Sequence, residues 1–337
     1  MKRLMTIALC VITLCVYAQK EPWTWHYHKM MPQNMPIKKN EIVFSKIDVP
    51  AFTQLLFSWN AFRPQKGHFS FYVQVRNAKQ KQWGPWHKMV DWGNNIQKSY
   101  ESRSDGTCKY LYVRLETEQN QKADAFRIKM MADNADLAQI KSFTVNASDL
   151  TKFNNESTFF GSLPSVLVDA VPQKSQLVLS HAKKRMMCSP TSCSMMLEYL
   201  TDKKINPLDF AQKSYDYGLN AYGSWPFNTA HAFECADGKT QFYIARLHSF
   251  EILHKKLQEG VPVVVSVRGD ITGAPKVYNN GHLLVVIGYD AQKSRVICHD
   301  PAALTDQETF KEYPMQSFVR AWERSRRLSY IAVPKVA

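Results

Sequence analysis

The chain is poor in cysteine and lacks the usual metal-binding patterns. Its 337 residues include seven cysteines, too few and too widely spaced for the disulfide scaffold of a small secreted domain. Paired CxxC motifs, which often hold structural zinc, do not occur, so we expect no metal and no cofactor. Long runs of lysine or arginine are also missing, as are the stacking aromatics of RNA-binding modules. We therefore expect no nucleic-acid partner.

Long apolar runs are missing too, apart from one near the start. This run covers residues 4–17, follows Lys2 and Arg3, and ends before Ala18. The layout is typical of a secretory signal, and the run is too short to span a bilayer comfortably. We expect residues 1–18 to be removed near Ala18 and the protein to be exported, to the periplasm or the cell exterior. Five cysteines would remain, an odd number that leaves at least one thiol unpaired.

Acidic residues are outnumbered in both halves of the mature chain. Residues 19–150 contain 19 basic and 12 acidic residues, and residues 151–337 contain 22 and 17. A basic exported protein can attract anionic polymers. Cell-envelope polymers are therefore candidate partners of the first half, where Trp83, Trp86 and Trp92 straddle turns and could stack on sugar rings. Trp59, inside an apolar run, is expected in the core.

Residues 19–150 alternate apolar and polar side chains in several short runs. The runs HFSFYVQVRN, YLYVRLET and AFRIKMMAD each place their apolar residues on one face, and turn signals such as KGH, WGNN and SDGT separate them. No helix is expected among them. This half therefore predicts an antiparallel β-sandwich.

The second half mixes helical and strand periods. Helices are expected at residues 188–200, after Asn206, and between Ser249 and Gly260, whereas VPVVVSV, HLLVVIGYD, RVICHD and LSYIAV read as strands. We expect a polar linker at residues 151–164 and an α+β domain, a helical cluster followed by strands, at residues 165–337.

The segment RMMCSPTSCSMMLEYL (residues 185–200) puts a cysteine at the start of a helix. A thiol nucleophile needs a lowered pKa and a base within reach. Cys188 precedes Pro190, which suits a first turn, and the positive end of the helix dipole favours a thiolate there. Cys193 would lie inside the helix as a structural thiol. Cys188 is the candidate nucleophile, with a buried structural thiol as the alternative.

His282 has the most suggestive setting of the ten histidines. It follows Asn-Asn-Gly and begins an apolar strand, which would place its imidazole beside a loop. Asp300 ends a short strand eighteen residues later. If the two strands form a hairpin, the Asp300 carboxylate comes alongside His282 and can fix its tautomer. An ordinary strand-edge histidine and a turn aspartate are the alternatives.

An acyl-transfer site also needs a hydrogen-bond donor for the oxyanion. Gln173 and Gln176 both lie upstream of the cysteine, and the residues alone do not choose between them. His181 is closer to the cysteine in sequence, but closeness along the chain is not closeness in space.

The segment AYGSWPFNTAHAF could line a substrate cleft. It places Trp225 and Phe227 before a helix that Asn228 would cap. Core packing is the alternative for these residues.

The order of these motifs resembles a known family. Gln176, Cys188-Ser-Pro-Thr-Ser, Gly-His282 and Asp300-Pro succeed one another as in the bacteriocin-processing-type, papain-like cysteine peptidases, family thirty-nine of the cysteine peptidases. The sequence looks most like an exported bacterial branch with a CSPTS motif and a Met-rich helix. The segments SWPFNTA and NNGHLLVVIGYD extend the resemblance over most of residues 165–335. LLFSWNAFRP and KQWGPWHKMVDWG are similar to the β-rich N-terminal region of that branch.

The resemblance implies a papain-like fold, in which a nucleophile helix packs on an antiparallel sheet that carries the histidine and the acid. By motif position it implies Cys188 as nucleophile, His282 as base and Asp300 as orienting acid. It implies Gln176 as the oxyanion donor, because the family's glutamine also follows a VP…S stretch. The usual Cys-Gly-Pro reads Cys-Ser-Pro here. No transporter segments follow, so a role as the peptidase domain of a peptide exporter is not implied.

Three functions remain open at this point. The first is an exported cysteine peptidase or amide hydrolase that acts on a peptide or protein substrate. The second is a papain-like module that binds peptide or glycan without turnover. The third is an acyl-transfer enzyme, because a thioester accepts an amine as well as water.

Overall fold

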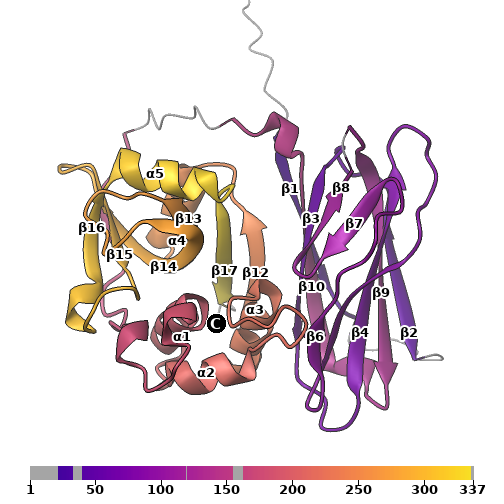
Figure 1. The fold of residues 1–337 in the computed structure, drawn as a ribbon, viewed down its shortest axis with the longest axis horizontal. Coiled ribbons are helices and arrows are strands. Elements are labelled where there is room, and N and C mark those ends of the chain that lie inside the picture. The colour runs from indigo at the N-terminus through magenta and orange to yellow at the C-terminus, as the bar shows by residue number, and fades with distance from the viewer. Residues whose placement is uncertain (1–21, 33–39, 119, 155–161, 335–337) are drawn as a thin grey trace, which may run out of the picture.

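The structure, a computed structural model, describes residues 22–32, 40–118, 120–154 and 162–334. These residues form two parts that lie side by side, an N-terminal sandwich (residues 22–153) and a C-terminal part (residues 162–334) (Figure 1). The expected signal segment 1–18 lies outside the described residues, as do residues 155–161 of the expected linker. Among the helices described, none is long and apolar enough to cross a membrane.

Two five-stranded antiparallel sheets build the N-terminal sandwich. The first sheet has the order β1 (Thr24–Met30), β10 (Ile140–Ser148), β3 (Gln54–Ala61), β8 (Arg114–Thr117), β7 (Cys108–Leu111). The second has the order β2 (Glu41–Lys46), β9 (Ala123–Asp133), β4 (His68–Asn77), β5 (His87–Gly93), β6 (Gln97–Ser99). Short 3-10 turns, η1 (Leu137–Gln139) and η2 (Leu150–Lys152), flank β10.

The period-two pattern of the sequence marks the inner faces of this sandwich. Phe69, Phe71, Val73 and Val75 of β4 are all buried in its core, where they meet Trp59. The run YLYVRLET does not form one strand, as its alternation suggested. It breaks into β7 and β8 at Tyr112, which has a positive φ of 54° and turns the chain back in a tight hairpin.

The three tryptophans expected at turns have different surroundings. Trp92 lies inside β5 and is fully buried. The prediction that its ring stacks on sugars is therefore wrong. Trp83 and Trp86 are partly exposed, but cations cover their rings: the Arg127 guanidinium lies 4.0 Å from the Trp83 ring centre, and the Lys129 ammonium 4.8 Å from that of Trp86.

An antiparallel sheet forms the centre of the C-terminal part. Its order is β12 (Thr240–Arg246), β17 (Leu328–Pro334), β13 (Val263–Gly269), β14 (Tyr278–Asp290), β15 (Arg295–His299), β16 (Phe310–Pro314), with β11 (Val166–Leu167) paired to β14. The helices are α1 (Cys188–Thr201), α2 (Pro207–Lys213), α3 (Trp225–Cys235), α4 (Phe250–Gln258) and α5 (Met315–Arg324). The 3-10 turns are η3 (Gln176–Val178), η4 (Lys184–Met186) and η5 (Gln307–Thr309).

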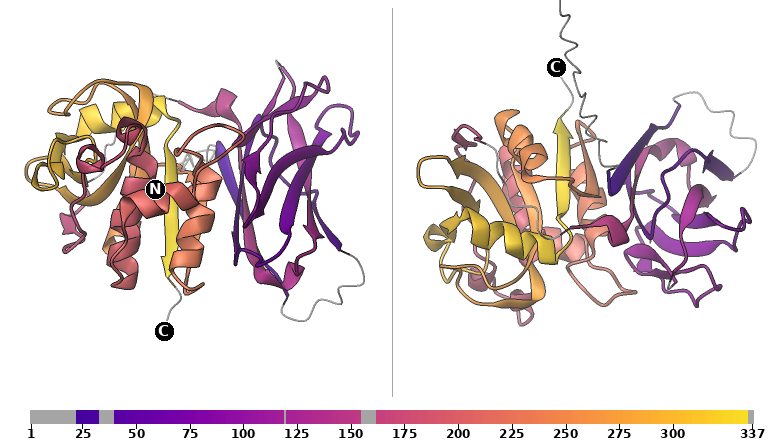
Figure 2. Two further views of the ribbon diagram at one scale, coloured as in Figure 1. Left: turned by 60° about the horizontal axis from the view of Figure 1, so that its bottom comes forward. Right: turned by 90° about the horizontal axis from the view of Figure 1, so that it is seen from above.

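Helices and strands alternate more in this part than the sequence suggested. β12 precedes α4, and α5 lies between β16 and β17, so the helices do not form one cluster ahead of the strands. Helix α1 packs on β14, α3 on β12, and α4 and α5 both contact β13. Figure 2 shows the C-terminal part and the sandwich from two further directions. Asn206 caps α2 and Pro207 begins it, as expected.

The sandwich covers one edge of the C-terminal sheet. The backbone N–H groups of β12 that face it bond to side chains of β3 and β10: Phe242 to Asn60 Oδ1 at 2.8 Å, and Arg246 to Asn146 Oδ1 at 2.9 Å. Phe227 of α3 is also inserted into the sandwich core. An exposed sheet edge is a template for unwanted pairing, so the sandwich protects β12 while it docks.

Candidate active site

Cys188 is the first residue of α1, and its side chain is partly exposed. No side chain caps this helix end. Small hydroxyl residues instead tie its first turns to the sheet: Ser192 Oγ donates to the carbonyl of Leu283 at 3.1 Å, and Ser189 Oγ lies 2.9 Å from the hydroxyl of Tyr330. The CSPTS motif thus brings the helix close to β14 and β17 and fixes the thiol above the sheet.

The thiol of Cys188 lies in contact with the imidazole of His282. Burial opposes a thiolate here, but hydrogen bonding and charge from His282 outweigh it and lower the pKa of Cys188. The backbone N–H groups of Leu283 and Ser189 also donate to the sulfur and favour the thiolate. The positive end of the α1 dipole acts in the same direction.

The imidazole of His282 is buried and lies between the thiol and a carboxylate. Its Nε2 lies 2.7 Å from Asp300 Oδ1, which leaves Nδ1 for the Cys188 sulfur. Burial alone would disfavour the imidazolium, yet Asp300 and Cys188 raise the pKa of His282 to about 9. We expected His282 to begin its strand, and this is wrong. Strand β14 starts four residues earlier, at Tyr278.

Asp300 comes directly after β15, and the pairing of β14 with β15 brings its carboxylate beside His282, as the predicted hairpin requires. Two tyrosine hydroxyls donate to Oδ2, from Tyr278 at 2.5 Å and from Tyr313 at 2.7 Å. The backbone N–H of Ala302 donates to Oδ1 at 2.9 Å. Burial would raise the pKa of Asp300, but His282 and the two tyrosine hydroxyls lower it to about 2.

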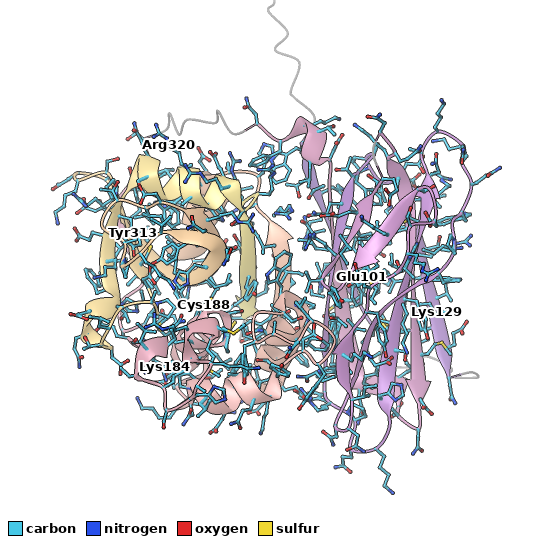
Figure 3. All side chains as sticks on the ribbon, in the orientation of Figure 1. Glu101, Lys129, Lys184, Cys188, Tyr313 and Arg320 are labelled. Atoms are coloured by element: carbon cyan, nitrogen blue, oxygen red, sulfur yellow. The ribbon has the colours of Figure 1, made fainter. Side chains whose placement is uncertain are left out.

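The two tyrosines are residues of the candidate site that the sequence analysis missed. The ring of Tyr278 also stacks on the His282 imidazole, with centroids 4.2 Å apart and planes 13° apart. Tyr313 comes from β16, on the far side of β15, and Figure 3 labels it in the same half of the molecule as Cys188. The pairing of β14 with β13 is irregular between Tyr278 and His282, where Gly281 has a positive φ of 86°. A regular strand would separate residues four apart by about 13 Å, so the period-two pattern gave no signal for this stacking.

Gln176 lies in η3 and is almost fully buried. Its backbone N–H donates to the carbonyl of Pro301 at 2.9 Å, so the glutamine turn and the loop after Asp300 are joined. Its side-chain Nε2 donates to the carbonyl of Lys184 at 3.1 Å. A primary amide carries two N–H donors, so one remains available to another acceptor.

Comparisons with known proteins find a family likeness in the C-terminal part. Residues 168–330 match the sequence profile of the Peptidase_C39 like family. These residues belong to the C39-like peptidase family. The chain is therefore a cysteine peptidase with a papain-like fold and an N-terminal β-rich part.

Two solved structures are similar to part of the chain. One is described as a C39-like peptidase from Bacillus anthracis, with 20% identity, coverage of 51% of this chain and 100% of its own, and a TM-score of 0.39. The other is Xylellain, a cysteine protease from Xylella fastidiosa, with 14% identity, coverage of 52% and 87%, and a TM-score of 0.35. No curated protein matches the chain.

Other candidate groups of the peptidase lie apart from this cluster. His181 contacts the hydroxyl of Tyr222 at 3.5 Å, and Gln173 is half-buried upstream of η3. All five cysteines in the described part of the chain, Cys298 included, are free thiols. Burial raises the pKa of the four others, Cys108, Cys193, Cys235 and Cys298. Only Cys188 among the described cysteines has a lowered pKa.

The segment expected to line the substrate cleft is mostly core. Phe227 is fully buried against Trp59 of the sandwich, with ring centroids 5.6 Å apart. Asn228 does not cap α3, because the helix begins at Trp225 after Ser224; its amide instead donates to the carbonyls of Tyr222 and Ser224. Trp225 remains partly exposed and lines a pocket between the two parts.

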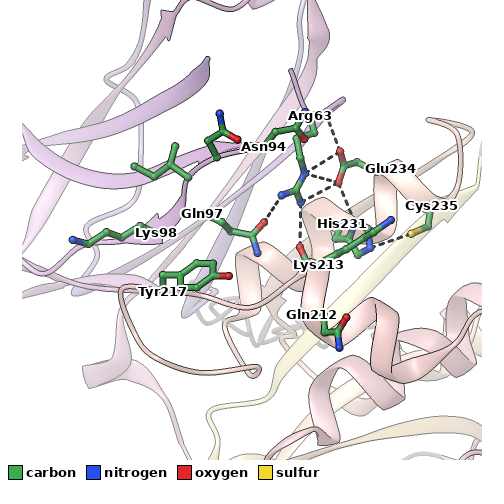
Figure 4. Close-up of a pocket in the computed structure, with 12 residues that line it drawn as sticks. Arg63, Asn94, Gln97, Lys98, Gln212, Lys213, Tyr217, His231, Glu234 and Cys235 are labelled. Carbon is green, nitrogen blue, oxygen red and sulfur yellow. Dashed lines mark hydrogen bonds and ion pairs between the residues drawn. The ribbon is translucent and has the colours of Figure 1, made fainter. Parts of the chain in front are cut away.

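A larger pocket of about 800 Å³ lies at the junction of the sandwich with the peptidase domain (Figure 4). Its Cys235 Sγ lies 3.4 Å from His231 Nε2, and His231 Nδ1 lies 3.0 Å from Glu234. This arrangement resembles a second triad. However, burial and the nearby Glu234 raise the pKa of Cys235 to about 11, and Arg63 pairs with Glu234 at 3.2 Å. The group is therefore a structural junction between the two parts.

Proposed function

We propose that the protein hydrolyses peptide or amide bonds through Cys188, His282 and Asp300, with Gln176 assisting at the oxyanion. The observation that supports this most is the opposed pKa shifts of the touching pair, with Cys188 lowered and His282 raised to about 9. Such shifts favour a thiolate beside an imidazolium at neutral pH, the pairing that activates a thiol nucleophile.

In the proposed reaction, the Cys188 thiolate attacks the substrate carbonyl carbon. The carbonyl oxygen takes the negative charge, and a donor from Gln176 Nε2 together with backbone N–H groups stabilises it. The His282 imidazolium gives its proton to the leaving amine as the C–N bond breaks, which leaves a thioester on Cys188. His282 then removes a proton from water, which attacks the thioester and releases the acid and the thiolate. Asp300 keeps the imidazole oriented and balances its charge.

The substrates we propose are peptides or amides outside the cytoplasm, because the chain begins with a segment typical of a secretory signal. Fractionation of cells that make the tagged chain, with sequencing of its mature N-terminus, checks this part. A full-length chain retained in the cytoplasm would contradict it.

We expect iodoacetamide to label Cys188 faster than the other cysteines, with an apparent pKa below the usual ~8.5 of a free thiol. The reason is that His282 stabilises the thiolate, so the measurement is the labelling rate between about pH 4 and pH 9, read by peptide mass spectrometry. His282→Ala should return the Cys188 rate to that of an ordinary thiol. An inert Cys188, or a rate that His282→Ala leaves unchanged, would contradict the proposed pair.

Gln176→Ala should lower kcat by about 10²–10³-fold, the usual effect of removing one oxyanion donor. The labelling rate of Cys188 should stay the same, because the amide is proposed to act on the substrate oxygen and not on the thiol. Gln173→Ala is the matched control, a nearby glutamine outside the site, and should leave kcat unchanged. Equal effects of the two substitutions would remove Gln176 from the mechanism.

A further inference from the structure

A second cluster of chemically reactive side chains lies in the sandwich, in the other part of the molecule from Cys188. His87 begins β5, Asp105 lies in the turn before β7, and Cys108 begins β7. His87 and Cys108 are buried, and the Asp105 side chain is only 9% exposed. The proposed hydrolysis uses none of these groups.

The donor atoms of the three side chains converge. His87 Nε2 lies 3.0 Å from Asp105 Oδ2 and 3.4 Å from Cys108 Sγ, and the sulfur lies 3.6 Å from the same carboxylate oxygen. Zinc bonds of about 2.0 Å to nitrogen and oxygen and about 2.3 Å to sulfur put tetrahedral ligand atoms about 3.3–3.6 Å apart. The observed triangle therefore has nearly the size of one face of a zinc tetrahedron.

The remaining atoms of these side chains are held by other groups. The Ser102 hydroxyl lies 2.7 Å from His87 Nδ1. When this hydroxyl accepts a hydrogen bond from Nδ1–H, Nε2 carries no proton and its lone pair can bind a metal. The N–H groups of Thr107 and Cys108 each donate to Asp105 Oδ1 at 2.7 Å, which leaves Oδ2 turned toward the other two ligands. Such outer contacts orient metal ligands in known sites.

A fourth group stands near the cluster. Glu118 follows β8, the partner strand of β7, and its backbone N–H donates to the carbonyl of Thr107, the residue before Cys108, at 2.7 Å. Its carboxylate Oε1 is buried, and no hydrogen-bond partner for it occurs in the described part of the chain. A buried carboxylate oxygen without a partner is costly, and a cation beside it would remove that cost.

We propose that His87, Asp105 and Cys108 bind one Zn²⁺ ion, with Glu118 or a water molecule in the fourth position. Binding replaces the thiol proton: the S–H bond breaks, a sulfur–zinc bond forms, and the proton passes to solvent. Mixed nitrogen, sulfur and oxygen ligands suit zinc, whereas Mg²⁺ and Ca²⁺ prefer oxygen alone. The ion would join β5 to the turn before β7. The sequence analysis did not predict this metal site, because its ligands are not spaced as a CxxC motif.

The test uses the full chain with Cys188→Ala, so that the active-site thiol cannot bind metal. We expect one equivalent of Zn²⁺ per chain by elemental analysis after dialysis, and a thiolate-to-cobalt charge-transfer band when Co²⁺ replaces zinc. Adding Cys108→Ser should abolish the band and lower zinc affinity by about 100-fold or more. Cys235→Ala, which removes the half-buried thiol at the other His–Cys contact, is the matched control and should leave both unchanged.

The proposal fails if the Cys188→Ala protein binds no stoichiometric zinc, or if the cobalt band survives Cys108→Ser. Should Cys108→Ser not fold, crystals of the Cys188→Ala protein soaked in zinc decide the matter. Anomalous density among His87, Asp105 and Cys108 supports the site, and its absence there overturns it.

Discussion

Replacement of Cys188 by alanine should lower kcat/KM for peptide hydrolysis by about 10⁴-fold or more, as loss of a covalent nucleophile does in comparable triads. A quenched-fluorescent peptide library supplies the substrate for the measurement. Stability should change little, because the side chain is partly exposed and alanine suits the first turn of a helix.

Cys193 offers a closely matched control for this substitution. It lies in the same helix, five residues on, but it is fully buried and burial raises its pKa. Cys193→Ala should retain the activity and lose some stability through the small cavity it leaves. Activity that survives in Cys188→Ala, or disappears equally in Cys193→Ala, would place the chemistry on another group.

Three residues of the site were predictable because local sequence controls where they lie. Cys188 precedes a helix with a proline in its first turn, and the structure begins α1 at that cysteine. His282 lies in β14 and Asp300 directly follows β15, and a hairpin between two such apolar strands brings the two side chains together. These arguments need only strand pairing and the start of a helix, which short segments specify.

The tyrosines around Asp300 were harder to predict because they depend on long-range pairing. Tyr313 reaches the carboxylate only because β16 pairs with β15, with Tyr313 opposite Val296. We expected neither β16 nor α5. The helix was foreseeable, because its buried residues Met315, Phe318, Val319 and Trp322 have helical spacing.

The segment SWPFNTA was left open between a cleft lining and core packing, and the structure gives core packing at Phe227. Trp225 is partly exposed and lines a pocket. Phe227 instead fills a gap in the sandwich core, and its partner Trp59 lies more than 160 residues away in sequence. Apolar periodicity indicates that a residue is buried but does not indicate which domain buries it.

Asp300→Ala should lower kcat/KM by about 10³–10⁴-fold, the range seen when the third member of a triad is lost. It should also cost roughly 3–5 kcal/mol of folding free energy, because a buried ion pair is broken on one side only. The hydroxyls of Tyr278 and Tyr313 lose their shared acceptor as well. Kinetics and denaturant unfolding measure the two losses separately.

Asp300→Asn tests the charge with little change of shape. An amide can still accept from His282 through Oδ1, and the tyrosine hydroxyls can rotate to accept from its nitrogen. The carboxylate charge is lost, so the pKa of His282 should fall well below about 9, since burial then dominates. The upper limb of the pH profile of kcat/KM should therefore move down by more than about one unit.

The same shift should alter how stability depends on pH. The folded pKa of His282, about 9, exceeds its unfolded value of 6.5, so its contribution is complete below pH 6.5 and is lost as the pH rises through about 9. Asp300 acts at the other end: its folded pKa of about 2 lies below 3.8, so its contribution is present above pH 3.8 and is lost as the pH falls through about 2. Asp300→Asn should remove both dependences.

Tyr313→Phe is the control that separates charge from hydrogen bonding. It removes one donor to Asp300 and leaves the carboxylate beside His282, so the upper limb should stay near pH 9. Asp300→Asn could leave the upper limb of the pH profile of kcat/KM in place, or Tyr313→Phe could move it as far as Asp300→Asn does. Either result would mean that the Asp300 carboxylate does not stabilise the His282 imidazolium. The assignment of Asp300 as the positioning residue of the triad would then be wrong, even if Cys188 proves to be the nucleophile.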